Sequence, residues 1–121
     1  MFTTELATET EKSKLSLATT DLLKEEAKTW YYRGFVYKEL YKKRDKENKI
    51  SVYRLESIKA FKKMLTLNNK EEFSESAIKI LKYEASTLYN DAARLLTLDS
   101  YNLAIKNYQL FKQTMLIVNS E

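Results

Sequence analysis

Several residue types are missing or nearly missing from this sequence, and each absence removes a class of function. The chain has no cysteine, no histidine, no proline and a single glycine, Gly34. Without cysteine it has neither a disulfide framework nor a thiolate metal site. Without histidine it lacks the commonest general base and the commonest metal ligand. One glycine cannot build a loop that cradles phosphate. We therefore expect a non-enzymatic protein with no catalytic residues, no metal site and no cofactor.

The scarcity of glycine and proline indicates the fold class. Sheet proteins use glycine and proline in their turns, and average sequences contain ~7% and ~5% of them. The length of 121 residues fits one domain, residues 1–121, and a hydrophobic content of 44% is enough for a core. We predict an all-α fold of antiparallel helix hairpins, with four main helices and a short helix before them.

Apolar residues recur every three or four positions in four segments, the spacing of one helix face. These segments are 22–43, 52–67, 74–97 and 101–118. Gly34 lies inside the first of them, and we expect it to mark a close crossing with a neighbouring helix. The predicted core faces comprise Leu23, Ala27, Trp30, Gly34, Tyr37 and Tyr41; Leu55, Ile58, Phe61, Met64 and Leu65; Ala77, Ile78, Leu81, Ala85, Leu88, Ala92 and Leu95; and Tyr101, Ala104, Ile105, Tyr108, Phe111, Met115 and Val118.

Short polar residues at the ends of these segments predict where the helices begin. Thr20 or Asp21 is the expected cap of the first main helix, after a weakly apolar lead-in over residues 1–20. Ser51 and Ser74 are the expected caps of the second and third helices. Asp99-Ser100 is expected to cap the fourth.

The charge pattern does not favour nucleic acid or membrane as a partner. The net charge of +4 is small, and most basic residues alternate with acids along the predicted helices. The charged run 43–49 is expected to be an exposed loop, although it could contact an acidic partner. No window approaches the ~20 apolar residues of a membrane span. The first residues lack the pattern of a signal peptide. The compartment stays open: the cytoplasm is the default, and export is the alternative if the sequence is a fragment that lacks its leader.

The first two helices carry a family resemblance. Trp30, Gly34 and Tyr37 fill the places of the pattern W-x2-L-G-x2-Y, with Arg33 where leucine is usual. This pattern opens the tetratricopeptide repeat, and the chain resembles two divergent copies of that repeat. The first copy covers residues 24–68 and the second covers 74–118, with 1–22 as a lead-in.

The rest of the repeat pattern is weaker. The second-half places hold Ser57 for alanine, Phe61 for phenylalanine and Asn68 for proline, after a link that is longer than usual. The two copies are also spaced 47 residues apart, from Ser57 to Ala104, instead of the usual ~34. The second copy places Leu88, Ala92, Leu95, Tyr101, Ala104 and Tyr108 at motif positions.

The resemblance implies a short α-solenoid that holds another protein or peptide in a groove lined by the first helix of each repeat. The carboxylate-binding Lys and Asn of one family subset are replaced by Tyr31 and Phe35, so an apolar or helical partner is expected. With Tyr89, these two residues are expected to lie off the core stripe. The partner-binding positions that the resemblance implies are Lys28, Tyr31, Phe35 and Lys38 in the first repeat and Ser86, Tyr89 and Ala93 in the second.

Two alternatives stay open at this point. The chain could be a structural or self-associating helical bundle, joined through the apolar end of its last helix around Leu116 and Ile117. It could also be a fragment of a longer repeat protein, because such arrays need about three repeats for stability. A basic contact of residues 42–49 with nucleic acid is a weaker third alternative.

Overall fold

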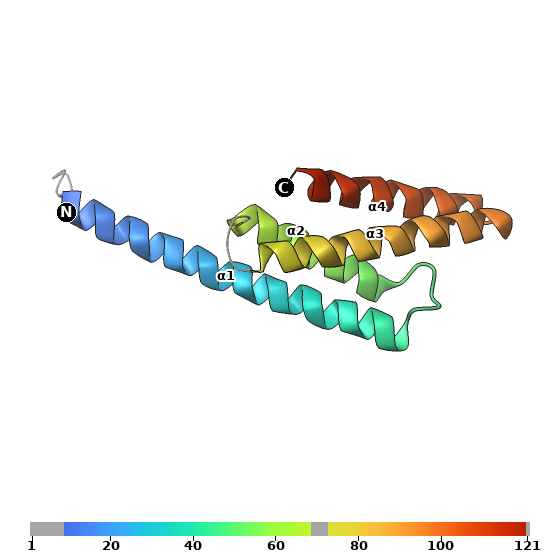
Figure 1. Cartoon of the computed structure of the whole chain (residues 1–121), viewed down its shortest axis with the longest axis horizontal. Coiled ribbons are helices and arrows are strands. Elements are labelled where there is room, and N and C mark those ends of the chain that lie inside the picture. Colours follow the sequence, from blue (N-terminus) through green and yellow to red (C-terminus); the bar gives the residue numbers. More distant parts are fainter. Residues whose placement is uncertain (1–8, 69–72, 121) are drawn as a thin grey trace, which may run out of the picture.

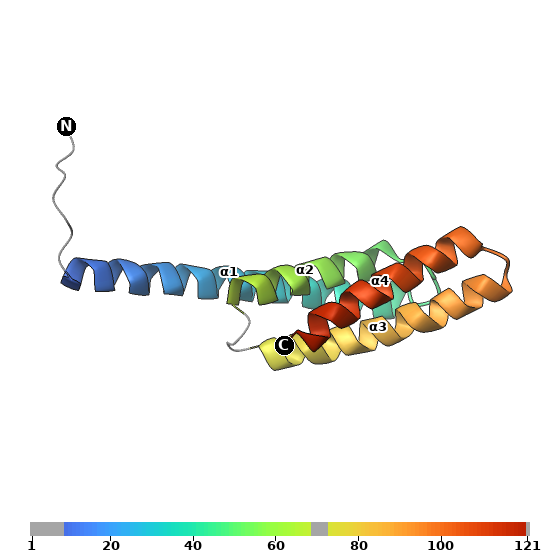
Figure 2. The ribbon, with the colours of Figure 1, turned by 90° about the horizontal axis from the view of Figure 1, so that it is seen from above.

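The computed structural model describes residues 9–68 and 73–120, and within them every regular element is an α-helix. The elements are α1 (Glu9–Arg44), α2 (Val52–Asn68), α3 (Ser74–Thr97) and α4 (Tyr101–Asn119). Helices α1 and α2 form one antiparallel hairpin, α3 and α4 form a second, and the two hairpins lie side by side (Figures 1 and 2). The predicted all-α fold of four main helices is confirmed.

The beginning of α1 differs from the expectation. The helix starts at Glu9 and continues without a break through Thr20 and Asp21, so the predicted cap there and the predicted separate short helix before it are both wrong. The sequence offers no proline or glycine before Gly34 that would end a helix. Every side chain that the structure describes between Thr10 and Glu26 is exposed. Half of α1 therefore projects beyond the rest of the molecule (Figure 1).

The core lies where the two hairpins meet. The predicted buried faces of α2 and α3 are confirmed with small deviations, because Leu55 and Ile78 are only partly buried. Small residues on α3, Ala77 and Ala85, are fully enclosed and allow close helix packing. One contiguous cluster contains the buried residues Ala27, Tyr31, Ile58, Phe61, Met64, Leu65, Ala77, Leu81, Leu88 and Val118.

The helix caps follow the sequence prediction in part. Ser51 precedes α2, and its Oγ accepts a hydrogen bond of 3.3 Å from the backbone N–H of Arg54, as expected of a cap. Ser74 is instead the first residue of α3, and Phe73 occupies the cap position with a φ of 77°. The ring of Phe73 stacks on Tyr31 with centroids 4.5 Å apart, and this packing holds the left-handed residue in place. Ser100 occupies the cap position of α4 without a side-chain hydrogen bond.

The orientation of α4 is the largest departure from the prediction. Tyr101, Ile105 and Tyr108 were expected in the core and are exposed instead. The inward face carries Ala104, Asn107, Thr114 and Val118. The polar members of this face are satisfied, since Asn107 Nδ2 donates to Lys49 O at 2.6 Å and Thr114 Oγ1 donates to Leu110 O at 2.7 Å. Because these compact side chains turn inward, Tyr101, Ile105 and Tyr108 remain on the surface.

Gly34 marks a close helix crossing, as predicted. A Cβ at this position would lie 2.8 Å from Cε1 of Phe61, a fully buried ring on α2. Ser57 Oγ donates to Gly34 O at 2.9 Å, so the two backbones are also joined by a hydrogen bond. The crossing therefore depends on the absence of a side chain at position 34.

We expect Gly34→Ala to destabilise the fold by up to about 2 kcal/mol, measured by urea denaturation. Overpacking a core costs ~1–3 kcal/mol, which exceeds the about 1 kcal/mol that alanine gains in a helix. Phe61→Leu should cost less in the Gly34→Ala background than in the native chain, because leucine vacates the space that the new methyl group needs. An equal cost of Phe61→Leu in both backgrounds would contradict this explanation.

Candidate functional site

An apolar groove lies on the surface between α3 and α4. It is an open hollow of about 310 Å³ near the turn that joins the two helices. Small residues, Ala92, Ala93 and Ala104, lie between larger ones, so the surface is hollowed between the two helices. The residues that line this groove are Tyr89, Ala92, Ala93, Leu96, Ala104, Ile105 and Tyr108. We call this surface the α3–α4 groove.

Aromatic rings form one wall of the α3–α4 groove. The ring of Tyr89 lies 5.3 Å from Phe111 and 6.5 Å from Tyr108, measured between centroids. Tyr108 and Phe111 stack at 5.8 Å, and the ammonium of Lys112 lies 5.4 Å from the centre of the Tyr108 ring. These contacts hold the rings in place while Tyr89 and Tyr108 stay exposed. A rigid, exposed aromatic wall loses little entropy when a partner covers it.

The seven residues that line the groove are all uncharged. Lys112 on α4 is exposed beside the Tyr108 ring, whereas Lys106 lines a separate hollow with Leu103 and Leu110. Asp91 is buried and paired with Arg54, so it contributes little to the field at the surface. Asp99, in the turn, is the exposed acid in this region. The groove is therefore an apolar surface with one lysine, Lys112, beside its aromatic wall.

Two of the sequence-predicted binding residues, Tyr89 and Ala93, line the α3–α4 groove. Ser86 is exposed on the same helix, and its hydroxyl donates to Tyr83 O at 2.7 Å. The contacts of Tyr89 lead to α4 and not to α1, which is where the resemblance places the other half of the binding site.

The predicted residues on α1 form a separate group. Lys28 and Phe35 are exposed, and the ammonium of Lys38 lies 4.1 Å from the centre of the Phe35 ring. Lys38 Nζ also donates to Glu39 Oε1 at 2.7 Å, and this hydrogen bond is the main reason why the pKa of Glu39 is lowered. Whether these α1 residues contact a partner stays a prediction.

Tyr31 is part of the core, and its expected place off the core stripe is wrong. It is only 7% exposed. Its ring stacks on Phe73 and lies 5.7 Å from Phe61, and its hydroxyl shares a hydrogen bond of 2.8 Å with Ser76 Oγ. Phe73 and Ser76 belong to the beginning of the second hairpin, so Tyr31 joins the two hairpins and is not free to contact a partner.

The groove residues that sequence reasoning missed are Leu96 on α3 and Ile105 and Tyr108 on α4. Ile105 and Tyr108 were expected in the core because large apolar residues usually are. The sequence carries one indication that Ile105 and Tyr108 could be exposed, because α4 is apolar on two faces. Its second apolar face consists of Leu103, Leu110 and Ile117, which are partly buried. A helix that is apolar on two faces buries one within its own fold and leaves the other for a partner.

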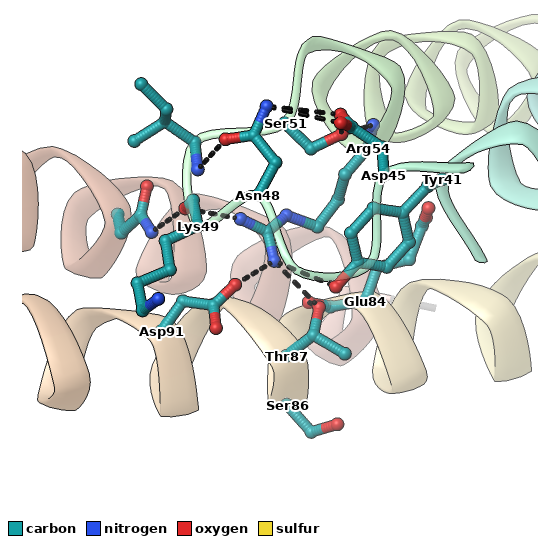
Figure 3. Close-up of polar contacts among 12 residues, drawn as sticks. Tyr41, Asp45, Asn48, Lys49, Ser51, Arg54, Glu84, Ser86, Thr87 and Asp91 are labelled. Atoms are coloured by element: carbon teal, nitrogen blue, oxygen red, sulfur yellow. Dashed lines mark hydrogen bonds and ion pairs between the residues drawn. The ribbon is translucent and has the colours of Figure 1, made fainter. Parts of the chain in front are cut away.

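A network of buried polar groups lies beneath the surface and joins three helices (Figure 3). Arg54 on α2 is 1% exposed and donates to Asp91 Oδ2 on α3 at 2.8 Å. The same guanidinium donates to Tyr41 Oη on α1 and to Thr87 Oγ1 on α3, both at 3.2 Å, and to Lys49 O at 2.9 Å. These charge-assisted bonds fix the position of α3 relative to the first hairpin.

Glu84, on α3, is buried near this network. Burial raises the pKa of its carboxyl from 4.5 to about 8, while the Ser57 hydroxyl, Arg54 and Lys38 act in the opposite direction. Neither carboxyl oxygen has a hydrogen-bond partner within the described residues. Glu84 is therefore mostly protonated at neutral pH. It is not among the residues that line the groove, and its effect is on stability.

Comparisons with known proteins add no family to this picture. No family model matches the chain, and neither a curated protein nor a solved structure does. The helices that the structure describes contain no stretch that is long and apolar enough to span a membrane. The described residues also hold no group of three or more acidic, cysteine or histidine side chains arranged to bind a metal ion.

Proposed function

We propose that this chain is a non-enzymatic protein-binding module that takes an amphipathic helix of another polypeptide in the α3–α4 groove. The observation that carries this proposal is the groove itself, in which Ile105, Leu96 and the rings of Tyr89 and Tyr108 remain uncovered. Concave apolar surfaces with aromatic walls are the usual anchors of protein interfaces.

The walls of the groove favour a helical occupant over an extended one. Both walls are α-helices, whose backbone N–H and C=O groups are already bonded within each helix. They have no free backbone groups with which to pair an extended peptide. An occupant must therefore satisfy its own backbone, as a helix does.

The tetratricopeptide resemblance is part of the same proposal. Two features support it: the helices pair as two antiparallel hairpins, and Gly34 meets Phe61, which are both motif positions of the first repeat. Repeats of this kind act as scaffolds that hold other proteins. In this chain, the proposed binding surface lies between α3 and α4 and not along the first helices of the two repeats.

We expect Ile105→Lys to weaken the binding of a helical peptide at least tenfold. The peptides for this test come from a display library of random amphipathic helices selected against the full chain. Burying an isoleucine contributes ~1.5–3 kcal/mol, and about 1.4 kcal/mol is a factor of ten in affinity. The measurement is a fluorescence titration of the selected peptide.

The matched control for this experiment is Val36→Lys on α1, because Val36 and Ile105 are both 55% exposed. The control should leave the affinity unchanged, and both variants should keep the native helical circular dichroism. Unchanged binding by Ile105→Lys, or a loss on Val36→Lys instead, would reject the α3–α4 groove as the site.

A further inference from the structure

We propose that the first hairpin binds single-stranded nucleic acid, on a surface where aromatic rings and exposed cations of α1 and α2 lie side by side. This inference goes beyond the proposed function, because the surface belongs to the other hairpin from the α3–α4 groove and takes a different kind of partner. Two observations carry it: the positive charge of the chain is concentrated in this hairpin, and rings that are open to solvent lie among its cations.

The first hairpin is far more basic than the chain as a whole. Residues 27–68 contain twelve basic and four acidic residues, a net charge of +8. The other residues of the chain contain nine basic and thirteen acidic ones, so the net charge of +4 for the whole sequence hides this concentration. A field of one sign on one part of a molecule attracts polyanions to that part.

Aromatic rings lie next to one another and to an arginine on one surface of this hairpin. The guanidinium of Arg33 lies 5.0 Å from the centre of the Tyr37 ring and 5.9 Å from that of the Trp30 ring, all three on α1. The centroids of Tyr37 and of Tyr53, on α2, are 6.2 Å apart. Tyr53 is 36% exposed, and Trp30 and Tyr37 are partly exposed. We call the surface around these four residues the α1–α2 face.

Exposed cations extend the α1–α2 face along both helices. Arg33 and Lys59 both lie beside Glu56, with nitrogen–oxygen distances of 3.9 and 3.6 Å, which places Lys59 on this face. Lys63 follows Lys59 by four residues and therefore lies on the same side of α2. Arg44 lies three helical turns beyond Arg33 and therefore on the same side of α1. Because Lys59, Lys63 and Arg44 are all exposed, a chain of phosphates can meet cations along the length of the hairpin.

Rings among cations favour single-stranded nucleic acid over other polyanions. Proteins bind such strands by placing Lys and Arg at the phosphates and aromatic rings under the bases. A duplex keeps its base faces stacked inside, and an acidic protein or an anionic membrane has no bases to stack. The 17 residues of α2 extend over about 25 Å, the span of about seven stacked nucleotides. Tyr53 has an exposed ring in the middle of this surface and is the expected stacking platform.

Fluorescence anisotropy of the full chain with labelled oligouridylate and oligothymidylate of about ten nucleotides tests the proposal, and it also shows whether RNA or DNA is preferred. We expect binding whose logarithmic salt dependence has a slope of about −0.7 for each phosphate contact. Lys59→Glu/Lys63→Glu should lower the affinity at least about tenfold, because it replaces two contacts by repulsion. The matched control is Lys79→Glu/Lys82→Glu on α3, which changes the net charge equally at two exposed positions and should have a much smaller effect.

Tyr53 distinguishes nucleic acid from a polyanion without bases. Tyr53→Ala should lower the affinity for the oligonucleotides about fivefold or more and leave the salt slope unchanged, whereas Tyr53→Phe should keep the affinity. Heparin binding should not respond to Tyr53→Ala. Tyr101→Ala, at an exposed ring on α4, is the control, and all variants should keep the native helical circular dichroism.

Four results would overturn the inference of a nucleic-acid surface. They are the absence of oligonucleotide binding, binding that does not depend on salt, an affinity that Tyr53→Ala leaves unchanged, and preferred binding to heparin or to phosphatidylserine vesicles. The peptide titrations of the α3–α4 groove do not involve the α1–α2 face, so the proposed function stands or falls separately.

Discussion

Replacing Arg54 with alanine is expected to lower the free energy of unfolding by about 3–5 kcal/mol, because it leaves Asp91 buried without its partner. The pair is joined at 2.8 Å and has little contact with water. The substitution also removes the hydrogen bonds to Tyr41, Thr87 and Lys49 O, which join both hairpins. Small domains are stable by only about 5–15 kcal/mol, so this substitution should remove a large share of the total stability.

Urea denaturation followed by circular dichroism measures this loss of stability. Two further variants show whether the loss comes from the unpaired buried charge. Arg33→Ala removes an arginine whose ion pair with Glu56 spans 3.9 Å on an exposed surface, and it should cost less than about 1 kcal/mol. The double variant Arg54→Met/Asp91→Leu should recover most of the lost stability, since no charge is then left unpaired. A cost for Arg54→Ala as small as that of Arg33→Ala would show that the buried network does not join the hairpins.

Glu84 should make the stability of the fold fall as the pH rises from about 4.5 to about 8. In the unfolded chain its carboxyl loses a proton near its ordinary pKa of 4.5, and in the fold it does so at about 8. Between these values the folded state binds one proton more than the unfolded state. The free energy of unfolding therefore decreases by up to about 1.4 kcal/mol per pH unit. Below a pH of 4.5 Glu84 is neutral in both the folded and the unfolded state. Above a pH of about 8 it is ionised in both, and the loss of stability reaches its full size.

The pH dependence of stability must be assigned to Glu84 and not to the groups around it. Arg54 from α2 and Lys38 from α1 favour the ionised form, and the hydroxyl of Ser57 does as well, but burial outweighs them. Glu84→Gln removes the titration while keeping the shape of the side chain. The difference in unfolding free energy between Glu84→Gln and the native chain should be small at pH 5 and reach several kcal/mol at pH 8.

Glu75→Gln, an exposed position in the first turn of the same helix, is the control for that series. It should follow the native chain at each pH. A constant difference between Glu84→Gln and the native chain from pH 5 to pH 8 would show that the carboxyl is not buried in the way described here. Stability would then not depend on the proton of Glu84.

The sequence predicts the helices better than the surfaces they present. Apolar spacing defines α2 and α3 within a residue or two, because regular burial of one face leaves a regular pattern. The glycine in α1 predicts the crossing because only a missing side chain admits the ring of Phe61. The apolar spacing does not show which face of α4 turns toward the core. Asn107 is buried because Lys49 O is there to accept its hydrogen bond, and that carbonyl is far away in the sequence.

The same reason explains the errors at the candidate site. Tyr31 looks like an exposed residue from its place on the helix wheel, but Phe73 and Ser76 of the other hairpin cover it. Arg54 looks like a surface residue from its charge, and only the fold reveals its partner on α3. Tyr89 and Ala93 are predicted correctly as surface residues, whereas their neighbours Ile105 and Tyr108 become visible only once the face of α4 is known.

The position of the binding surface is most directly tested by methyl NMR of the full chain during titration with a selected helical peptide. The methyl groups of Ala92, Ala93, Ala104 and Ile105 line the α3–α4 groove, and Val36 reports on the exposed face of α1. Binding in the groove predicts the largest shift changes at the first four residues and little change at Val36. Changes centred on Val36, with the groove methyls unaffected, would contradict the proposed function.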